Sequence, residues 1–177
     1  MAYLIECPRP HDAAAIGQVH LRAWLQTYLN EDAGIDETWI RGNVGSVTTT
    51  EGIARWQKFI EEAEQQPYET FCRVARFGDE IVGLLCGRRD DVVTLGPMYL
   101  LEEVKGQGLG RRLMDEFLAW AGETSMRLWV TAYNERAIRF YTHYGFEMTG
   151  ESELWKDKLP NVRMVRHSPV AVTPRGN

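Results

Sequence analysis

The sequence predicts a single α/β domain, built on a mixed central sheet of six to seven strands with helices on both of its faces. The length of 177 residues suits one domain with one core. Apolar residues recur at helical and strand spacing in the order strand, two or three helices, three strands, helix, strand, helix and two strands. Neither a repeat nor a linker divides the chain, so we expect the domain to span residues 1–167, followed by a flexible polar tail at 168–177.

The first third of the chain predicts one strand followed by helices. The strand lies at 3–7, and a helix begins near Pro10 because apolar residues recur at helical spacing as far as Tyr28. Two more helices are predicted at 35–41 and 51–66 from the same kind of spacing. Threonines before the second of these supply an N-cap, and a proline after it stops the helix.

The middle of the chain predicts an antiparallel meander. Strands are expected at 70–77 and 80–88, joined by a short Gly-Asp turn, and a third strand is expected at 92–101. After the glycine-rich stretch that follows, apolar residues from Leu109 onward fall on one helical face, and Gly122 ends that helix.

The last third predicts a parallel crossover and a closing pair of strands. A strongly apolar strand at 126–132 follows the helix, so that strand, helix and strand make a right-handed βαβ unit. Asn134 then caps a helix that ends at Gly145. The two final strands are expected near 146–155 and 160–167.

Composition argues against two classes of partner. The formal net charge is −5, whereas nucleic-acid-binding domains usually carry a basic face, so we expect no nucleic acid. The apolar runs are far shorter than the roughly 20 residues of a membrane span, so we expect no membrane insertion. The N-terminus lacks a secretory signal pattern, which predicts a cytoplasmic protein. Cys7, Cys72 and Cys86 are expected to be reduced core residues.

The stretch VKGQGLGRR indicates an anion site. A dinucleotide fingerprint needs a third glycine where Arg111 stands, and a P-loop needs a lysine and a hydroxyl that this stretch lacks. Gly106, Gly108 and Gly110 instead lie between a strand and a helix, so that successive backbone N–H groups point toward an anion. Lys105 adds positive charge, and the predicted ligand is a pyrophosphate. A flexible strand-to-helix turn without a ligand is the alternative.

The chain resembles the GNAT superfamily of N-acetyltransferases over nearly its whole length. The family signature is Arg or Gln, two residues, Gly, one residue, and Gly or Ala, which corresponds here to Lys105, Gly108 and Gly110, with lysine at the first position. NERAIRFYTHYGFE, with its FY and GF pairs, is a second marker. The resemblance implies an enzyme that moves the acetyl group of acetyl-CoA directly to a primary amine in a ternary complex. The amine could belong to a small molecule, a polyamine or a peptide, and no metal is expected.

The resemblance also implies roles for individual residues. Tyr141 occupies the position of the general acid that protonates the departing thiolate, with a plain core tyrosine as the alternative. The edge amides of Tyr99 and Leu101 are expected to pair with the pantetheine arm, as an added strand would. The other expected coenzyme-binding residues are Leu100, Lys105, Gly106, Gln107, Gly108, Leu109, Gly110, Arg111, Asn134 and Ala137.

The acceptor is expected beside the first two helices. There Trp24 and Tyr28 are the candidate binding residues, and an aromatic and acidic wall would suit a cationic amine. The other members of that wall are Trp39, Glu31, Asp32, Asp36 and Glu37. An aromatic core beside a solvated acidic loop is the alternative interpretation.

The general base is not evident from the sequence. The 92–101 segment carries no acid, and the acids that flank it are more typical of solvated turns. These acids are Asp90, Asp91, Glu102 and Glu103. Two other functions stay open: a non-catalytic acyl-CoA-binding regulator and a nucleotide-dependent oxidoreductase. Dimerisation is common in the family, so a homodimer is one state open to this chain.

Overall fold

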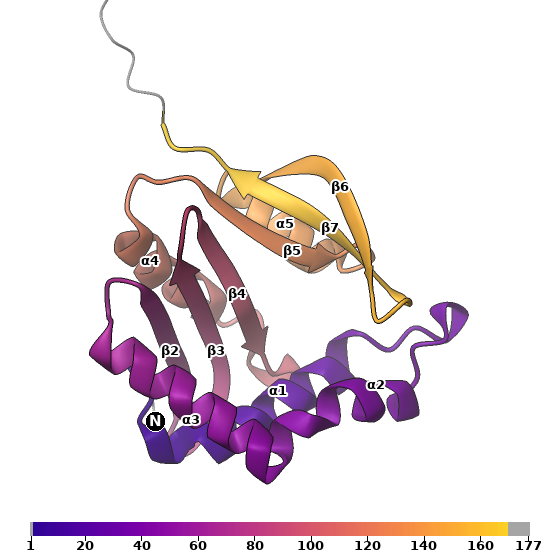
Figure 1. Ribbon diagram of the computed structural model, residues 1–177, viewed down its shortest axis with the longest axis horizontal. Helices are drawn as coiled ribbons and strands as arrows, with labels where there is room; N and C mark the ends of the chain where they lie inside the picture. Colours follow the sequence, from indigo (N-terminus) through magenta and orange to yellow (C-terminus); the bar gives the residue numbers. More distant parts are fainter. Residues whose placement is uncertain (1, 170–177) are drawn as a thin grey trace, which may run out of the picture.

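Seven strands form one sheet in the order β1-β2-β3-β4-β5-β7-β6, in a computed structural model that describes residues 2–169 (Figure 1). The strands are β1 (Tyr3–Glu6), β2 (Thr70–Phe77), β3 (Glu80–Arg89), β4 (Val93–Leu100), β5 (Met126–Thr131), β6 (Glu147–Trp155) and β7 (Leu159–Arg166). The helices are α1 (Ala13–Thr27), α2 (Glu37–Val44), α3 (Thr50–Gln65), α4 (Leu109–Ala121) and α5 (Glu135–His143). The predicted mixed sheet in a single α/β domain is confirmed.

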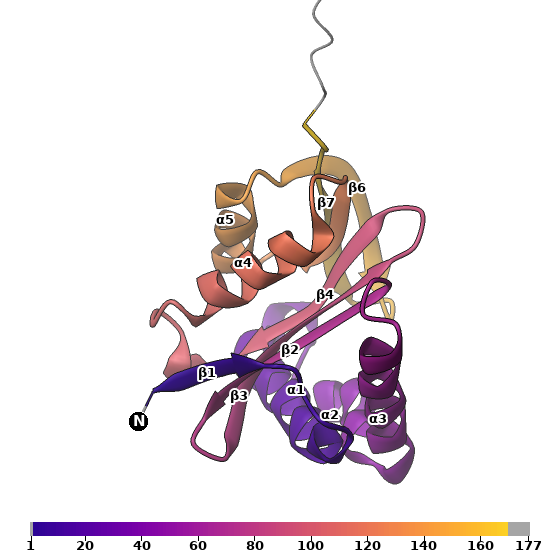
Figure 2. The same cartoon turned by 90° about the vertical axis from the view of Figure 1, so that its left-hand side faces the viewer.

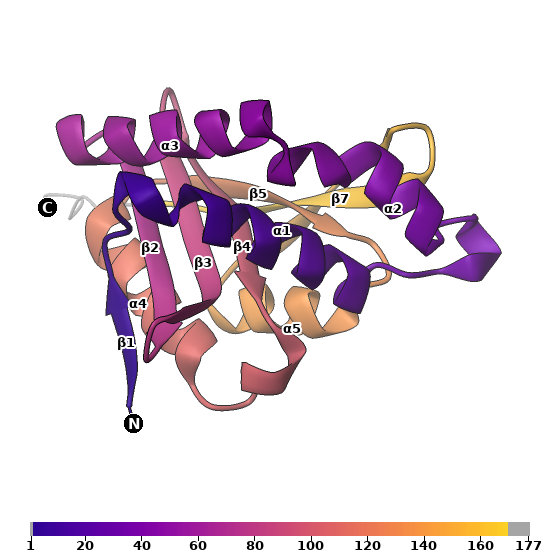
Figure 3. The same ribbon diagram turned by 90° about the horizontal axis from the view of Figure 1, so that it is seen from below.

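Helices cover both faces of the sheet. Figure 2 shows α1, α2 and α3 on one face and α4 and α5 on the other, and Figure 3 shows α1 and α3 lying across β2, β3 and β4. The main core joins the two layers, because Ile16 on α1, Leu84 on β3 and Phe117 on α4 are all fully buried in one cluster. None of the helices in residues 2–169 has the length and apolar character that a membrane span needs.

The parallel strands β4 and β5 separate soon after they meet. Val93 pairs with Met126 and Thr94 with Arg127, and within residues 2–169 the pairing of these two strands ends there. Every other neighbouring pair of strands is antiparallel. The second half of β4 therefore has β3 on one side only, which leaves alternate backbone N–H and C=O groups on its other edge without a strand partner.

Local capping accounts for the helix boundaries. The N–H of Trp39 donates a 2.7 Å hydrogen bond to Asp36 Oδ1, so α2 begins at Glu37 and not at the predicted residue 35. The N–H of Ala137 donates to Asn134 Oδ1 at 3.2 Å, which confirms Asn134 as the cap of α5. These caps satisfy N–H groups that the first turn of a helix leaves without an intrahelical partner.

The cysteines and the C-terminal segment differ in part from expectation. Cys7 is exposed, so its prediction as a core residue is wrong, whereas Cys72 and Cys86 are buried. These two lie opposite each other on β2 and β3 with their Sγ atoms 3.4 Å apart as free thiols. Ser168, the first residue of the expected tail, donates a 2.7 Å hydrogen bond to the carbonyl of Glu123. Residues 170–177 of that tail lie outside the described part of the chain.

Candidate functional site

The glycine-rich stretch forms the entry to α4. Gly106 and Gly108 have φ values of 82° and 80°, in the left-handed region that glycine adopts without steric conflict. Gly108 is the N-cap of α4, and its carbonyl accepts a 3.1 Å hydrogen bond from the N–H of Arg112. The N–H groups of the first turn before Arg112 therefore have no partner within the helix and carry the positive end of its dipole.

A basic cavity of about 550 Å³ lies at this helix entry. We call it the basic cavity because Lys105, Arg111, Arg136 and Arg139 line it and, among residues 2–169, no aspartate or glutamate does. It runs between the open edge of β4 and α5, and its volume is within the range of small-molecule and cofactor sites. An extended, multiply anionic ligand is the chemistry that this lining suits.

Most of the sequence-predicted coenzyme residues line the basic cavity. They are Tyr99, Leu100, Lys105, Gly106, Gly108, Gly110, Arg111, Asn134 and Ala137, together with the proposed acid Tyr141. Leu101, Gln107 and Leu109 do not line it. Leu101 and Leu109 are buried in the core, and the Gln107 side chain donates to the carbonyl of Glu103 at 3.1 Å.

The expectation that the amides of Tyr99 and Leu101 face the cavity is wrong. The N–H of Leu101 donates to the carbonyl of Val82 at 3.0 Å, so it is part of the β3 ladder. In an antiparallel pair the hydrogen-bonding direction alternates from residue to residue, so Tyr99 also faces β3. The N–H and C=O groups of Met98 and Leu100 are the ones that face the open side of β4, and both residues line the cavity.

A second, aromatic cavity of about 310 Å³ is lined by residues of both β4 and β5, at the gap between these strands. We call it the aromatic cavity. The aromatic side chains that line it are Trp24, Tyr28, Tyr99, Trp129, Tyr141 and Trp155. Glu153 is the one charged side chain among its lining residues, all of which lie in the described part of the chain. The two cavities thus differ in charge, one basic and one weakly acidic.

The two cavities meet at a shared set of residues, which we call the junction. These residues are Tyr28, Met98, Tyr99, Asn134, Ala137 and Tyr141. The Tyr141 hydroxyl donates to Met98 Sδ at 3.8 Å, and burial raises the pKa of that hydroxyl well above its ordinary value. Burial also raises the pKa of Tyr28 to about 12 and that of Tyr99 further. All three hydroxyls are therefore protonated near neutral pH and can donate hydrogen bonds.

Trp24 and Tyr28 line the aromatic cavity as expected, but the acidic wall beside them is not there. The Asp36 carboxylate caps α2, and Glu37 pairs with Arg41 at 2.7 Å. Glu31 and Asp32 lie exposed in a short 3-10 turn, and none of the four acids lines either cavity. Trp39 contacts the ring of Trp155 at a centroid distance of 5.8 Å and lies outside both linings. For these acids the solvated alternative is the correct one.

Three of the four acids that flank β4, namely Asp91, Glu102 and Glu103, lie in ion pairs. Glu102 accepts from Lys105 Nζ at 2.6 Å and from Arg136 at 3.3 Å, and the hydrogen bond from Lys105 is the main cause that lowers its pKa. Glu103 pairs with Arg22 at 2.6 Å, and its pKa is also lowered, first by a backbone hydrogen bond. Asp91 lies 3.6 Å from Arg127. Carboxylates with lowered pKa values are weak proton acceptors, so Glu102 and Glu103 are poorly suited as bases.

Several lining residues were missed from the sequence. Four of them lie on α5, namely Arg136, Arg139, Phe140 and His143, and a fifth, Tyr144, is the C-cap residue of that helix. Their spacing follows one helical face, so the periodicity that located the helix would have identified them once Asn134 was assigned to the site. Glu153 and Trp155 lie two residues apart on β6, and both line the aromatic cavity. The order of the strands in the sheet brings them to the same cavity as Trp24, so the local sequence does not indicate them.

Comparisons with known proteins agree with this geometry. A family model described as the acetyltransferase (GNAT) family matches residues 23–146. A probable N-acetyltransferase of Mycobacterium tuberculosis is 24% identical over 178 residues, which cover 93% of this chain and 95% of that protein. A peptidyl-lysine N-acetyltransferase of Escherichia coli is 37% identical over 78 residues, 43% of this chain and 48% of that protein. This second match therefore spans about half of each protein.

Solved structures share the fold. The PaiA N-acetyltransferase of Thermoplasma acidophilum, in complex with coenzyme A, superposes with a TM-score of 0.74 at 18% identity and covers 94% of this chain and 99% of its own. The putative acetyltransferase YncA of Salmonella typhimurium, with its cofactor acetyl-CoA, gives a TM-score of 0.69 at 19% identity over 100% of both chains. Because the family model spans more than two thirds of the sequence, the chain belongs to the acetyltransferase (GNAT) family and is an acyltransferase.

Proposed function

We propose that this protein transfers the acetyl group of acetyl-CoA directly to a primary amine, within a ternary complex. One observation carries the proposal: a basic cavity and a weakly acidic aromatic cavity meet at Tyr141 in the gap between β4 and β5. An anionic coenzyme suits the first, and an amine that is cationic in water suits the second. The thioester and the amine then meet at the junction.

The coenzyme diphosphate lies on the entry to α4. The N–H groups between Gly106 and Arg111 bind its oxygens, and Lys105 and Arg111 add charge. Lys105 now pairs with Glu102 at 2.6 Å, so binding of a diphosphate exchanges that carboxylate for a phosphate. Arg136 and Arg139 on α5 face the same cavity and are placed to bind the remaining phosphate charge.

The pantetheine arm pairs with the open edge of β4. Met98 and Leu100 offer the backbone groups that β3 does not use, so an extended chain can bind there as an added strand. The sequence predicts these contacts at Tyr99 and Leu101, whereas the proposal places them on the alternate residues Met98 and Leu100. The acyl end of such a chain reaches the junction, because Met98 lines both cavities.

Tyr141 protonates the thiolate of coenzyme A as it departs. Its hydroxyl lies at the junction, and burial keeps it protonated. A thiol of pKa about 8.5 makes thiolate protonation worth about 2 kcal/mol at pH 7, whereas an amine of pKa about 10.4 needs about 4 to 5 kcal/mol to lose its proton. β4 carries no carboxylate, Glu102 and Glu103 are ion-paired, and neither Asp90 nor Asp91 lines either cavity, so we assign that proton loss to water.

Direct transfer leaves the cysteines as spectators. Cys86 is fully buried on β3, and burial raises the pKa of its thiol well above the ordinary value, which disfavours the nucleophilic thiolate. Neither Cys86 nor Cys72 lines the basic or the aromatic cavity. An acetylated enzyme intermediate on these thiols is therefore not part of the proposal.

Initial-velocity kinetics test the proposed function. Acetyl-CoA and an amine are varied together, and release of the coenzyme A thiol is followed with a thiol reagent. We expect amine-dependent thiol release with intersecting double-reciprocal lines, as a ternary complex requires. Parallel lines would indicate an acetyl-enzyme, and tight binding of acetyl-CoA without thiol release for any amine would favour the non-catalytic regulator.

A further inference from the structure

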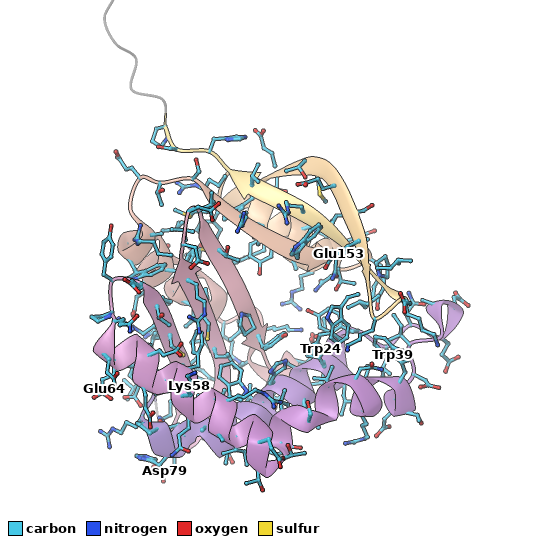
Figure 4. The ribbon with its side chains drawn as sticks, in the orientation of Figure 1. Trp24, Trp39, Lys58, Glu64, Asp79 and Glu153 are labelled. Carbon is cyan, nitrogen blue, oxygen red and sulfur yellow. The ribbon has the colours of Figure 1, made fainter. Side chains whose placement is uncertain are left out.

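We propose that Glu153 binds a second cationic group of the acceptor, so that the preferred acceptors are diamines or amines of similar charge spacing. The inference rests on the proposed function, because it concerns what fills the aromatic cavity during transfer. It adds a residue on β6 that determines specificity. In Figure 4, Glu153 comes from the β5–β7–β6 side of the gap, whereas Trp24 comes from α1.

The lining of the aromatic cavity favours a cation at its outer end. Glu153 is its one charged side chain, and Trp24, Trp129 and Trp155 line the same cavity. Tryptophan is the aromatic side chain that attracts cations most strongly, and a carboxylate in the same cavity adds a charge-assisted hydrogen bond. A ligand with an anionic tail would meet repulsion there, so the composition selects against amino acids with a free carboxylate.

A polar row across three strands holds the Glu153 carboxylate in place. Thr131 on β5, Asn161 on β7 and Glu153 on β6 lie in register. The Thr131 hydroxyl donates to Asn161 Oδ1 at 3.3 Å, and the Asn161 amide donates to Glu153 Oε1 at 3.4 Å. The amide orients the carboxylate without neutralising its charge, and within residues 2–169 Glu153 forms no ion pair.

The neighbouring cation is already engaged. Arg163 lies two residues from Asn161 on β7, stacks on Trp129 at 4.4 Å from the ring centroid, and pairs with Glu151 at 3.4 Å. Glu151 and Arg163 thus balance each other outside the cavity lining, and Glu153 keeps a free negative charge at the cavity. This difference between two acids on one strand makes Glu151 a matched control for Glu153.

Glu153 is not one of the junction residues, where the thioester and the amine meet. Neighbouring strands lie about 4.8 Å apart, so the backbone of Glu153, two strands from β5, lies about 10 Å from Thr131. Glu153 also lines only the aromatic cavity, whereas Tyr28, Asn134 and Tyr141 line both. One group on the acceptor can therefore bind Glu153 while a separate amine, at the end of a short aliphatic chain, reaches the junction.

Length-matched amines test the inference. Wild type, Glu153→Gln and Glu151→Gln are assayed at saturating acetyl-CoA with 1,4-diaminobutane, 1,5-diaminopentane and 1,6-diaminohexane, each against its monoamine. We expect wild type to prefer at least one diamine over its monoamine in kcat/KM. Glu153→Gln should lose about tenfold in kcat/KM for that diamine, through KM, and leave the monoamine unchanged. Glu151→Gln should behave as wild type with both.

Each other outcome overturns a defined part of the account. Equal losses for diamine and monoamine in Glu153→Gln would place Glu153 in the proton transfer or the fold, and would contradict the binding of a second charge. A wild type without preference for any diamine, or equal losses in both glutamate variants, would also overturn the inference, while the proposed function would stand. Thiol release with none of the amines would overturn the proposed function together with the inference.

Discussion

The indole Nε1 of Trp24 donates a 2.8 Å hydrogen bond to the hydroxyl of Tyr99, which joins α1 to β4 at the junction of the two cavities. Tyr99 is half-buried and packs against His20, whose ring centroid lies 4.7 Å away, and the indole is the hydrogen-bond partner of its hydroxyl. Trp24 also packs on Trp155 at 5.2 Å. One side chain therefore both forms a wall of the aromatic cavity and fixes the orientation of Tyr99.

Replacing Trp24 by Phe tests this link. The variant keeps an aromatic ring but leaves the Tyr99 hydroxyl without its donor, so we expect a loss of about 1–3 kcal/mol in the free energy of unfolding. The KM for the amine should also rise severalfold, because the shape of the aromatic cavity changes. Trp120→Phe is the control: it removes a 2.7 Å hydrogen bond to the carbonyl of Pro67, away from both cavities. An equal rise in KM for both variants would refute the positional role of Trp24.

Gly108→Ala tests the diphosphate site. A Cβ at φ 80° costs about 1–2 kcal/mol of stability, and at Gly108 it would occupy open space at a residue that lines the basic cavity. We expect the Kd for coenzyme A, measured by titration calorimetry, to rise about tenfold. Gly122→Ala, at φ 70° and at the other end of the same helix, should lower stability without changing that Kd. Unchanged coenzyme affinity in stable Gly108→Ala protein would place the diphosphate elsewhere.

Tyr141→Phe tests the general acid. Removing the hydroxyl should lower kcat about 100-fold, the lower end of the usual contribution of acid–base catalysis, with little change in the KM for acetyl-CoA. Tyr144→Phe is the control, because Tyr144 is the C-cap residue of the same helix and lines the basic cavity but not the junction. The pH profile of kcat gives the second readout. A profile and a kcat that match wild type would assign Tyr141 to the core.

His20 is expected to make stability depend on pH. Burial lowers the pKa of His20 to about 4, and its Nδ1 has no hydrogen-bond partner within residues 2–169. The unfolded chain takes up this proton near pH 6.5 and the folded chain only near pH 4, so stability falls as the pH drops between these values, by about 3 kcal/mol.

Urea unfolding at several pH values measures this effect. His20→Phe should flatten the decline between pH 6.5 and pH 4, since the aromatic contacts with Trp56 and Tyr99 can persist without a titrating ring. His167→Gln, at an exposed position, should leave the decline as it is in wild type. A wild-type slope in His20→Phe would mean that another group controls the acid sensitivity.

Local chemistry made the donor side of the site predictable from the sequence. The glycines at 106 and 108, the cap at Asn134 and the apolar face of α4 each depend on residues within a few positions of one another. Local chemistry does not predict which alternate residues of β4 turn their backbone N–H and C=O groups toward the cavity. Whether Leu100 or Leu101 faces the cavity depends on the register with β3, which shifts between Leu85 and Gly87.

The residues of the aromatic cavity, where the acceptor is proposed to bind, depend on the order of the strands in the sheet. Short stretches of the sequence therefore do not predict them. β7 inserts between β5 and β6, which brings Asn161 beside Thr131 and places Glu153 one strand further out. A local pattern indicates instead the acids that are close to Trp24 in the sequence, but helix capping and ion pairing occupy two of these, Asp36 and Glu37. A pattern of alternating residues on β6 could locate a face of that strand but not what the face meets.

Transfer of a labelled acetyl group is the most direct test that the two cavities form one active site. Acetyl-CoA carrying ¹³C in its acetyl group is incubated with the protein and the panel of amines, and the products are measured by mass spectrometry. We expect a ¹³C-acetylated amine and free coenzyme A in equal amounts, with no label on the protein, and a much slower yield from Tyr141→Phe. Label bound covalently to the protein, or intact acetyl-CoA after incubation with every amine, would contradict direct transfer at this junction.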